Sequence, residues 1–219
     1  MPLYRHKTSY RRLSADRLEA WGAIPPAIAS DCMNRSQTMA ASIKPLAQGM
    51  VLCGQARTVT CMVGDNGAIH AALRLLEPDD VLVVDAGGFP DTAVFGGLLA
   101  QAAMARSAAG VVVHGAVRDC AEIVEFGLPV FASAIVPAGP HKGFGGTIDG
   151  PIACAGCPVS PGDIVLGDDD GIAVVPLADE DSVLNACNTK IAQEEEQIRR
   201  LQAGESLADQ MGLCEPEIL

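Results

Sequence analysis

Short apolar runs bounded by glycine, proline or acidic residues alternate along the chain with segments whose apolar positions recur at helical spacing. A short apolar run between turn residues is typical of a buried strand, and recurrence every three to four positions is typical of an amphipathic helix. The runs predict strands at residues 56–63, 81–84, 111–113, 130–132, 164–166 and 172–175. The helical spacing predicts helices at residues 13–21, 27–39, 68–76, 95–109, 121–126 and 178–203.

This alternation of strands and helices predicts a single α/β domain that spans residues 1–219. Val165 and Val174 lie on either side of the acidic turn G-D-D-D-G, so their strands are expected to pair as a hairpin in a mixed sheet. Residues 1–12 are basic and polar and are predicted to form an N-terminal arm. Residues 178–203 form the predicted C-terminal helix, and residues 204–219 a loose tail.

Composition narrows the class of protein. Hydrophobic residues make up 49% of the chain but aromatic residues only 4%, so the core is packed with Val, Ala, Leu and Ile. The formal net charge of −12 argues against a nucleic-acid partner, which needs a cationic surface. The N-terminus lacks the apolar stretch of a secretory signal, and no apolar run approaches the ~20 residues of a membrane span. A cytoplasmic protein without membrane contact is therefore expected.

Candidate chemistry centres on V-V-V-H-G-A-V-R-D at residues 111–119. Gly115 is expected to turn the chain as it leaves the buried strand, which places Arg118 and Asp119 at the carboxyl end of that strand, where ligands bind in α/β folds. A guanidinium clamps an anionic oxygen, and a neighbouring carboxylate can hold a hard divalent cation. The alternative is a surface ion pair that closes a loop. His114 lies on the strand itself and is predicted to pack inward.

Other motifs are predicted to be structural. Cys154 and Cys157 form a C-x-x-C beside turn residues and without a second ligand pair, so free buried thiols are expected. The acidic turn at residues 168–171 lacks the spacing of a calcium loop. No lysine lies in a predicted buried strand, which disfavours Schiff-base chemistry. His141 follows P-A-G-P in a loop that could reach the site and contact a substrate.

Several segments follow one another in a familiar order. They are P-D-D-V-L-V-V-D-A-G-G, F-G-G-L-L-A, G-V-V-V-H-G-A-V-R-D, G-L-P-V-F-A, P-A-G-P and P-G-D-I-V-L-G-D-D-D-G-I-A-V-V-P. Over most of residues 25–205 the chain therefore resembles the RraA-like family, which holds 4-hydroxy-4-methyl-2-oxoglutarate aldolase and the regulator of ribonuclease activity A. The resemblance implies a swivelling α/β/β/α sandwich that assembles as a homotrimer or homohexamer, with active sites between subunits.

The resemblance also implies roles for residues at matching positions. Arg118 would contact a 2-keto acid, and Asp119 would hold a divalent cation, Mg²⁺ or Mn²⁺. Asp85 closes a buried strand and either supports the site or caps a turn. Glu194 is the best match to a glutamate of the C-terminal helix that reaches the site of a neighbouring subunit.

A glycine-opened helix completes the implied site. Gly96 and Gly97 precede Leu98 and Leu99, whose amides would receive the substrate carboxylate. The free N–H groups and partial positive charge of a helix N-terminus give this role an independent reason. The chain departs from the aldolases at Gly97, where they carry Asp or Glu to organise the waters of the metal. Either another carboxylate supplies that function, or the chain belongs to a related lyase branch.

The activity implied is that of a class II, metal-dependent aldolase. A metal-stabilised pyruvate enolate would form when a 4-hydroxy-2-keto acid such as 4-hydroxy-4-methyl-2-oxoglutarate is cleaved to pyruvate. Oxaloacetate decarboxylation passes through the same enolate, so one site can do both. The alternative is a non-catalytic, protein-binding regulator of a ribonuclease, which the acidic composition and Gly97 favour.

Overall fold

A computed structural model describes residues 2–218, and Met1 and Leu219, at the ends of the predicted arm and tail, lie outside the described residues. The helices are α1 Ala15–Gly22, α2 Pro26–Cys32, α3 Gly67–Leu73, α4 Gly97–Met104, α5 Cys120–Phe126, α6 Glu180–Gln202 and α7 Leu207–Gln210, with a 3₁₀ turn, η1, at Leu177–Asp179. The strands are β1 Leu3–Arg5, β2 Lys44–Pro45, β3 Leu52–Cys61, β4 Asp80–Asp85, β5 Ala93–Phe95, β6 Gly110–Val117, β7 Val130–Ile135, β8 Gly146–Ile148, β9 Ile152–Cys154, β10 Cys157–Val159, β11 Ile164–Asp168 and β12 Gly171–Val175.

The sheet is mixed, as the sequence predicts. Strands β3, β4, β6 and β7 are neighbours and run parallel. The first half of β3 pairs with the antiparallel β11–β12 hairpin, and its second half pairs with β4, so β3 joins the two parts of the sheet. The acidic turn closes that hairpin, and the Asp168 carboxylate accepts the Asp170 N–H at 2.9 Å. Strands β9 and β10 form a separate two-stranded sheet.

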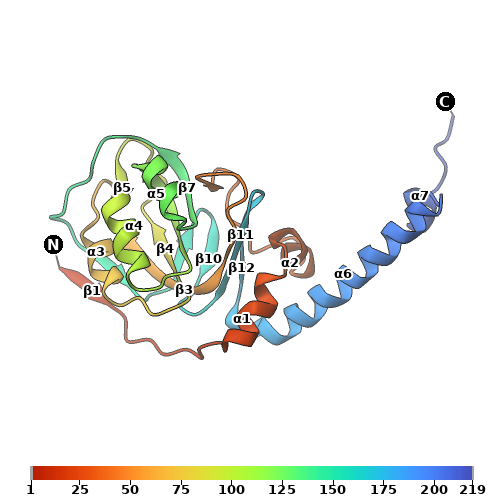
Figure 1. The fold of residues 1–219 in the computed structure, drawn as a ribbon, viewed down its shortest axis with the longest axis horizontal. Helices are drawn as coiled ribbons and strands as arrows, with labels where there is room; N and C mark the ends of the chain where they lie inside the picture. The colour runs from red at the N-terminus through yellow and green to blue at the C-terminus, as the bar shows by residue number, and fades with distance from the viewer. Residues whose placement is uncertain (1, 219) are drawn as a thin grey trace.

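Buried side chains divide the domain into layers. Leu82 and Val84 of β4 face one core, which helices α3, α4 and α5 cover (Figure 1). Val81 and Val83 of the same strand face a second core shared with β10 and β12, because successive side chains of a strand point to opposite faces. A third core lies between the β11–β12 hairpin and helices α1, α2 and α6. The order is α/β/β/α, the single-domain layering expected from the sequence.

The predicted helix at residues 27–39 is too long. Helix α2 ends at Cys32, and Asn34 and Gln37 take left-handed φ values of 58° and 59°. Met39 then donates its N–H to the Ile172 carbonyl at 3.0 Å, which draws this segment onto the edge of β12. A tertiary strand contact therefore overrides the local helical spacing.

The region around the Arg-Asp pair also differs from the prediction. Phe95 ends β5, which pairs with β6, so the helix predicted from residue 95 begins at Gly97 and ends at Met104. Gly115 does not turn the chain out of the sheet, because β6 continues to Val117. The strand instead carries a register shift between Val113 and Ala116 against β7. The pair at residues 118–119 still follows directly on the end of a buried strand.

The N-terminal arm is held against the domain by ion pairs. Strand β1 pairs with β8, and Arg5 Nε lies 2.7 Å from an Asp149 carboxylate oxygen. Arg12 pairs with Asp80, and the buried Arg57 lies between both carboxylates, 3.0 Å from Asp80 and 2.8 Å from Asp149. No helix among residues 2–218 is both long and apolar enough to cross a membrane.

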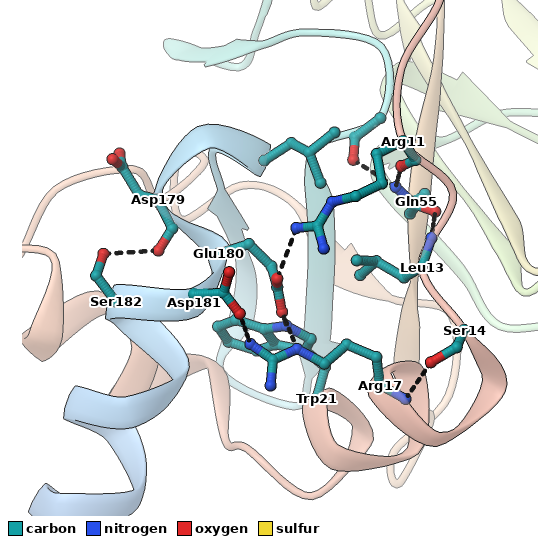
Figure 2. Close-up of polar contacts among 12 residues, drawn as sticks. Arg11, Leu13, Ser14, Arg17, Trp21, Gln55, Asp179, Glu180, Asp181 and Ser182 are labelled. Carbon is teal, nitrogen blue, oxygen red and sulfur yellow. Dashed lines mark hydrogen bonds and ion pairs between the residues drawn. The ribbon is translucent and has the colours of Figure 1, made fainter.

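Glu180 anchors the long C-terminal helix to the start of the chain (Figure 2). Its fully buried carboxylate accepts hydrogen bonds from Arg11 at 2.9 Å, from Trp21 Nε1 at 2.9 Å and from Arg17. Beyond this anchor α6 projects from the body of the domain (Figure 1). Burial raises the pKa of the Glu180 carboxyl, but the hydrogen bonds from Arg17, Trp21 and Arg11 outweigh burial and lower this pKa below its ordinary value of 4.5.

The Glu180 anchor predicts a pH-dependent contribution to stability. Because the pKa is lowered in the folded state, the contribution is present above pH 4.5, the ordinary value, and is lost as the pH falls through the folded-state pKa. Replacement Glu180→Gln is expected to cost about 1.5–3 kcal/mol at pH 7, the range for hydrogen bonds to a charged group. The measurement is the melting temperature of both proteins between pH 7 and pH 3. An equal difference in melting temperature at every pH would contradict this account.

Candidate functional site

A cavity of about 230 Å³ lies where the start of α4 meets the segment between β6 and α5. Helices α4 and α5 lie side by side on the same face of the sheet (Figure 1). Gly96, Leu98 and Leu99, at the start of α4, line one wall. The polar side chains that line the cavity are those of Asn66, His70, Arg118, Asp119, Glu122 and Lys142. The volume is below the ~300–1,000 Å³ of pockets for drug-sized ligands and suits a small organic acid.

Asp119 joins the two helices that form the cavity. It stands directly before α5 with a left-handed φ of 60°. The carboxylate accepts the Gly97 N–H at 3.0 Å, which ties the N-terminus of α4 to that of α5. The same oxygen of Asp119 lies 3.5 Å from Arg118 Nε, and the Asp119 side chain remains 40% exposed. Its second oxygen, Oδ1, has no hydrogen-bond donor within residues 2–218, so it is available to a ligand.

Arg118 is fixed through its backbone while its guanidinium stays accessible. Its N–H donates to the Phe95 carbonyl at 3.0 Å. The guanidinium passes so close to Gly139 that a Cβ there would lie 2.7 Å from one of its nitrogens. Asp119 is the ion-pair partner of Arg118 among the described residues, and the Arg118 side chain is 43% exposed. A planar cation held in this way can bind a carboxylate or keto oxygen.

The N-terminus of α4 offers fewer free amides than the sequence predicts. The Gly97 N–H is taken by Asp119, and the Leu99 N–H donates to the Gly96 carbonyl at 3.0 Å. The Leu98 N–H has no acceptor in the described part of the chain. The helix therefore presents one unpaired N–H at the cavity, together with the partial positive charge of its N-terminus.

Sequence reasoning missed four of the polar lining residues: Asn66, His70, Glu122 and Lys142. Asn66 is 4% exposed, donates from Nδ2 to the Val94 carbonyl at 3.0 Å, and has an Oδ1 without a partner. An unpaired buried amide oxygen costs about 1–3 kcal/mol, so it points to a ligand that can donate a hydrogen bond. Burial and the Lys142 charge lower the pKa of His70, which favours the neutral imidazole.

Other predicted site residues do not line the cavity. The Asp85 carboxylate lies 3.0 Å from His114 Nδ1 and accepts the Gly87 N–H at 3.0 Å, so it stabilises the turn after β4. His114 is half-buried in this contact. His141 is exposed, and its backbone pairs with the 64–66 segment. Glu194 lies on the projecting α6 in an ion pair with Lys190 at 3.1 Å.

The residues of the cavity fit a hard divalent cation. No group of three or more His, Cys, Asp or Glu side chains suited to a metal occurs within residues 2–218. Asp119 and Glu122 nevertheless line one cavity, and Mg²⁺ is commonly held by one or two carboxylates while water and substrate oxygens complete its shell. The donor set is all oxygen, which suits Mg²⁺ or Mn²⁺ better than a thiophilic metal.

The C-x-x-C motif lies away from this cavity. Cys154 and Cys157 are buried, face each other across β9 and β10, and are free thiols. Burial raises the pKa of Cys157 to about 11 and raises that of Cys154 as well. Protonated, buried thiols are poor metal ligands and nucleophiles, so a packing role fits both residues.

Gly96 is predicted to be essential for the geometry of the site. A Cβ at this position would lie 2.6 Å from Asp119 Oδ2 and 3.0 Å from Arg118 Cγ. Replacement Gly96→Ala is expected to displace both side chains and to lower turnover about 100-fold, the scale of a 1 Å misplacement. Gly22→Ala is the control, because a Cβ there meets nothing within 4 Å. Equal turnover of the two variants with a keto-acid substrate would contradict the prediction.

Comparisons with known proteins give one family model and several relatives. The family model described as RraA-like, Aldolase/RraA, matches residues 26–174. A Halalkalibacterium halodurans protein that bears the name 4-hydroxy-4-methyl-2-oxoglutarate aldolase as a provisional assignment is 34% identical, over 85% of this chain and 89% of its own. The Thermus thermophilus protein of that name is 39% identical, over 56% of this chain and 74% of its own. The Streptomyces coelicolor protein RraAS2 is described as an unusual member of the RNase ES inhibitor RraA protein family. Its structure is 26% identical in sequence and has a TM-score of 0.75, and the match covers 90% of this chain and 100% of that one.

Proposed function

This chain belongs to the RraA-like family, and on that premise we propose that it is a metal-dependent carbon–carbon lyase. The substrate is a 4-hydroxy-2-keto acid of the 4-hydroxy-4-methyl-2-oxoglutarate type, and pyruvate is a product. The observation that carries the proposal is the single cavity that joins Arg118, Asp119 and the unpaired Leu98 N–H. These groups supply an anion clamp, a carboxylate for a hard cation and a helix N-terminus within one small space.

Each group has a defined task in this proposal. The Leu98 N–H and the N-terminus of α4 bind the C1 carboxylate of the keto acid. Arg118 binds the C2 keto oxygen and stabilises the negative charge that develops on it when the C3–C4 bond breaks and a water in the cavity takes the proton of the C4 hydroxyl. Asp119 holds the divalent cation, which supplies Lewis acidity at that oxygen when it is bound. The hydrogen bond from the Gly97 N–H to the Asp119 carboxylate holds this carboxylate at the N-terminus of α4.

The leaving half of the substrate faces the rest of the cavity. The unpartnered Oδ1 of Asn66 suits a hydrogen-bond donor such as the C4 hydroxyl of a 4-hydroxy-2-keto acid. Oxaloacetate has no such hydroxyl but gives the same charge on the keto oxygen when carbon dioxide leaves. Oxaloacetate decarboxylation is therefore a second activity of the same site, and Lys142 lies where it can neutralise a second carboxylate.

Assembly into a homotrimer or homohexamer completes the proposal. Leu98 is 83% exposed beside the cavity, which favours burial of this wall against another subunit. Helix α6 is buried at its start, but Ile198 and Leu201 near its end are 52% and 39% exposed. A projecting helix with exposed apolar side chains suits contact with a neighbour, which would bring Glu194 toward that neighbour's site. Light scattering after size-exclusion chromatography measures the number of subunits.

Pyruvate release tests the proposed activity. The purified protein is treated with EDTA and assayed with 4-hydroxy-4-methyl-2-oxoglutarate and with oxaloacetate, first without metal and then with added Mg²⁺ or Mn²⁺. Turnover restored by metal supports the lyase, and the two rates rank the two leaving groups. A folded protein that releases no pyruvate from either substrate at any metal concentration would remove this function.

The second candidate is a protein-binding regulator of a ribonuclease. The net charge of −12 and the similarity to the RNase ES inhibitor family favour it. An acidic protein docks on a basic partner by electrostatic attraction, which salt weakens. Salt-sensitive binding to an RNase E-type enzyme without lyase turnover would favour the regulator, and turnover without such binding would favour the lyase.

A further inference from the structure

A loop at residues 138–144, between β7 and β8, supplies part of the cavity lining through Pro140 and Lys142. The loop contains no helix or strand, so individual hydrogen bonds to the rest of the domain decide where its backbone lies. Among the described residues that line the cavity, the cationic side chains are those of Arg118 and Lys142. Arg118 already has a task in the proposed function, so the loop decides where the second cation stands.

Asp65, in the turn before α3, holds one end of this loop. Its carboxylate is fully buried, and one oxygen accepts the N–H of Gly143 at 2.8 Å and that of Phe144 at 3.1 Å. The other oxygen accepts the Gly67 N–H at 2.8 Å, at the start of α3. Hydrogen bonds to a charged acceptor are the strong ones, so this buried carboxylate fixes the loop on the helix. Asp65 itself is not among the residues that line the cavity.

Lys142 is therefore held on both sides. On one side the His141 N–H donates to the Gly64 carbonyl at 2.8 Å, and the His141 carbonyl accepts the Asn66 N–H at 3.1 Å. On the other side the Asp65 carboxylate supplies the contacts. Removing that carboxylate frees one flank of Lys142 and leaves the backbone bonds of the other flank in place.

We propose that Asp65 is a positioning residue that holds Lys142 at the cavity, and that this loop gives the site a preference for 2-keto acids with a second carboxylate. The proposal rests on the proposed function, because it concerns the same substrate. A 4-hydroxy-2-keto acid of the 4-hydroxy-4-methyl-2-oxoglutarate type has a carboxylate at each end. Arg118 and the start of α4 bind its pyruvyl half, and the Lys142 ammonium binds the far carboxylate. Fixing the backbone of a long, flexible side chain lowers the entropy lost on binding.

Replacement Asp65→Ser separates the loop contact from the local turn. A serine hydroxyl can still accept the Gly67 N–H two residues ahead, but it is too short to reach the loop, so the Gly143 and Phe144 amides lose their acceptor. Hydrogen exchange of the full-length protein, followed by mass spectrometry, measures this loss. The two loop amides are expected to exchange about 10-fold faster or more in the variant. Equal exchange in both proteins would overturn the proposal.

The ligand test compares the dissociation constants of 2-oxoglutarate and pyruvate, measured by ligand-observed NMR with Mg²⁺. 2-Oxoglutarate has the carbon frame and both carboxylates of the proposed substrate, but it lacks the C4 hydroxyl. Asp65→Ser is expected to weaken 2-oxoglutarate binding about 10-fold, the scale of one contact to a charged group, and to leave pyruvate binding unchanged. Lys142→Met is expected to have the same selective effect. The double variant is expected to bind 2-oxoglutarate no more weakly than Lys142→Met alone, because both changes remove one contact.

Replacement Asp163→Ser is the matched control. Asp163 is 8% exposed, its carboxylate accepts the N–H groups of Ser160 at 2.7 Å and Leu177 at 2.9 Å, and it does not line the cavity. It is expected to lower the melting temperature and to keep both dissociation constants. Phe144→Pro removes one loop N–H donor at an exposed position and leaves Asp65 intact, so it tests the same contact if Asp65→Ser does not fold. It is expected to weaken 2-oxoglutarate binding selectively.

The outcomes separate this proposal from the proposed function. If Asp65→Ser and Phe144→Pro keep full affinity for 2-oxoglutarate, or weaken both ligands equally, the positioning role is refuted. Metal-dependent pyruvate release by the unchanged protein would then leave the proposed function standing. If the unchanged protein binds neither ligand and releases no pyruvate, both proposals fail.

Discussion

Replacing Asp119 with asparagine is expected to lower metal-stimulated pyruvate release about 1,000-fold or more, since several kcal/mol of charge stabilisation depend on the bound cation. The substitution removes the charge and keeps the shape. Asparagine accepts a left-handed φ such as the 60° of this residue, and its carbonyl oxygen can still accept the Gly97 N–H. The fold and the link between the two helices are therefore retained.

The measurement is steady-state pyruvate release at saturating Mn²⁺, together with the melting temperature of the variant. Asp91→Asn is a suitable control, because Asp91 is exposed and does not line the cavity. The account would be wrong if Asp119→Asn kept full metal-stimulated turnover. A second informative result is the metal-free rate, which is expected to be low and equal in the two proteins.

Replacing Arg57 with methionine is expected to destabilise the domain by about 3–5 kcal/mol, the range for removing one partner of a buried ion pair. Its side chain is 6% exposed and those of Asp80 and Asp149 are 0% exposed. Both carboxylates keep one arginine of the N-terminal arm, but those arginines are partly exposed and replace the lost contact incompletely. The melting temperature is expected to fall by about 10 °C, at roughly 2–4 °C per kcal/mol for a chain of this size.

Chemical and thermal unfolding of Arg57→Met measure this effect. Arg199→Met is the matched control, because Arg199 pairs with Glu196 at 2.7 Å while both side chains are more than half exposed. Such a surface pair contributes at most about 1 kcal/mol. A loss for Arg57→Met no larger than that of the control would show that the buried network does not stabilise the fold.

Local signals in the sequence predicted the parts of the fold that depend on local contacts. The acidic turn predicted the β11–β12 hairpin, and the apolar run before Arg118 and Asp119 predicted a buried strand that ends at the site. Strands β1 and β8 were missed because each is three residues long and is defined by pairing with the other across the chain. The same limit explains the overlong helix at residues 27–39, which the contact with β12 ends early.

The residues of the candidate site also divide into those that a local signal predicts and those that only the folded chain brings together. Residues in one continuous motif, such as Arg118 and Asp119, line the cavity together with Leu98 and Leu99, but only the Leu98 N–H is unpaired there among the described residues. Asn66 and Lys142 come from a turn and a loop that meet only in the folded chain, so no spacing in the sequence signals them. Glu122 had a local signal, three residues after Asp119, but its place in the cavity depends on the packing of α5 against α4.

The central claim is that this cavity stabilises negative charge on the keto oxygen of a pyruvyl group with the help of a cation. Exchange of the pyruvate methyl protons for deuterium, followed by proton NMR in heavy water, measures that step without any choice of leaving group. The account predicts exchange that requires added Mg²⁺ or Mn²⁺ and is lost in Asp119→Asn. A folded, Mn²⁺-binding protein that leaves the methyl protons of pyruvate unexchanged would contradict it.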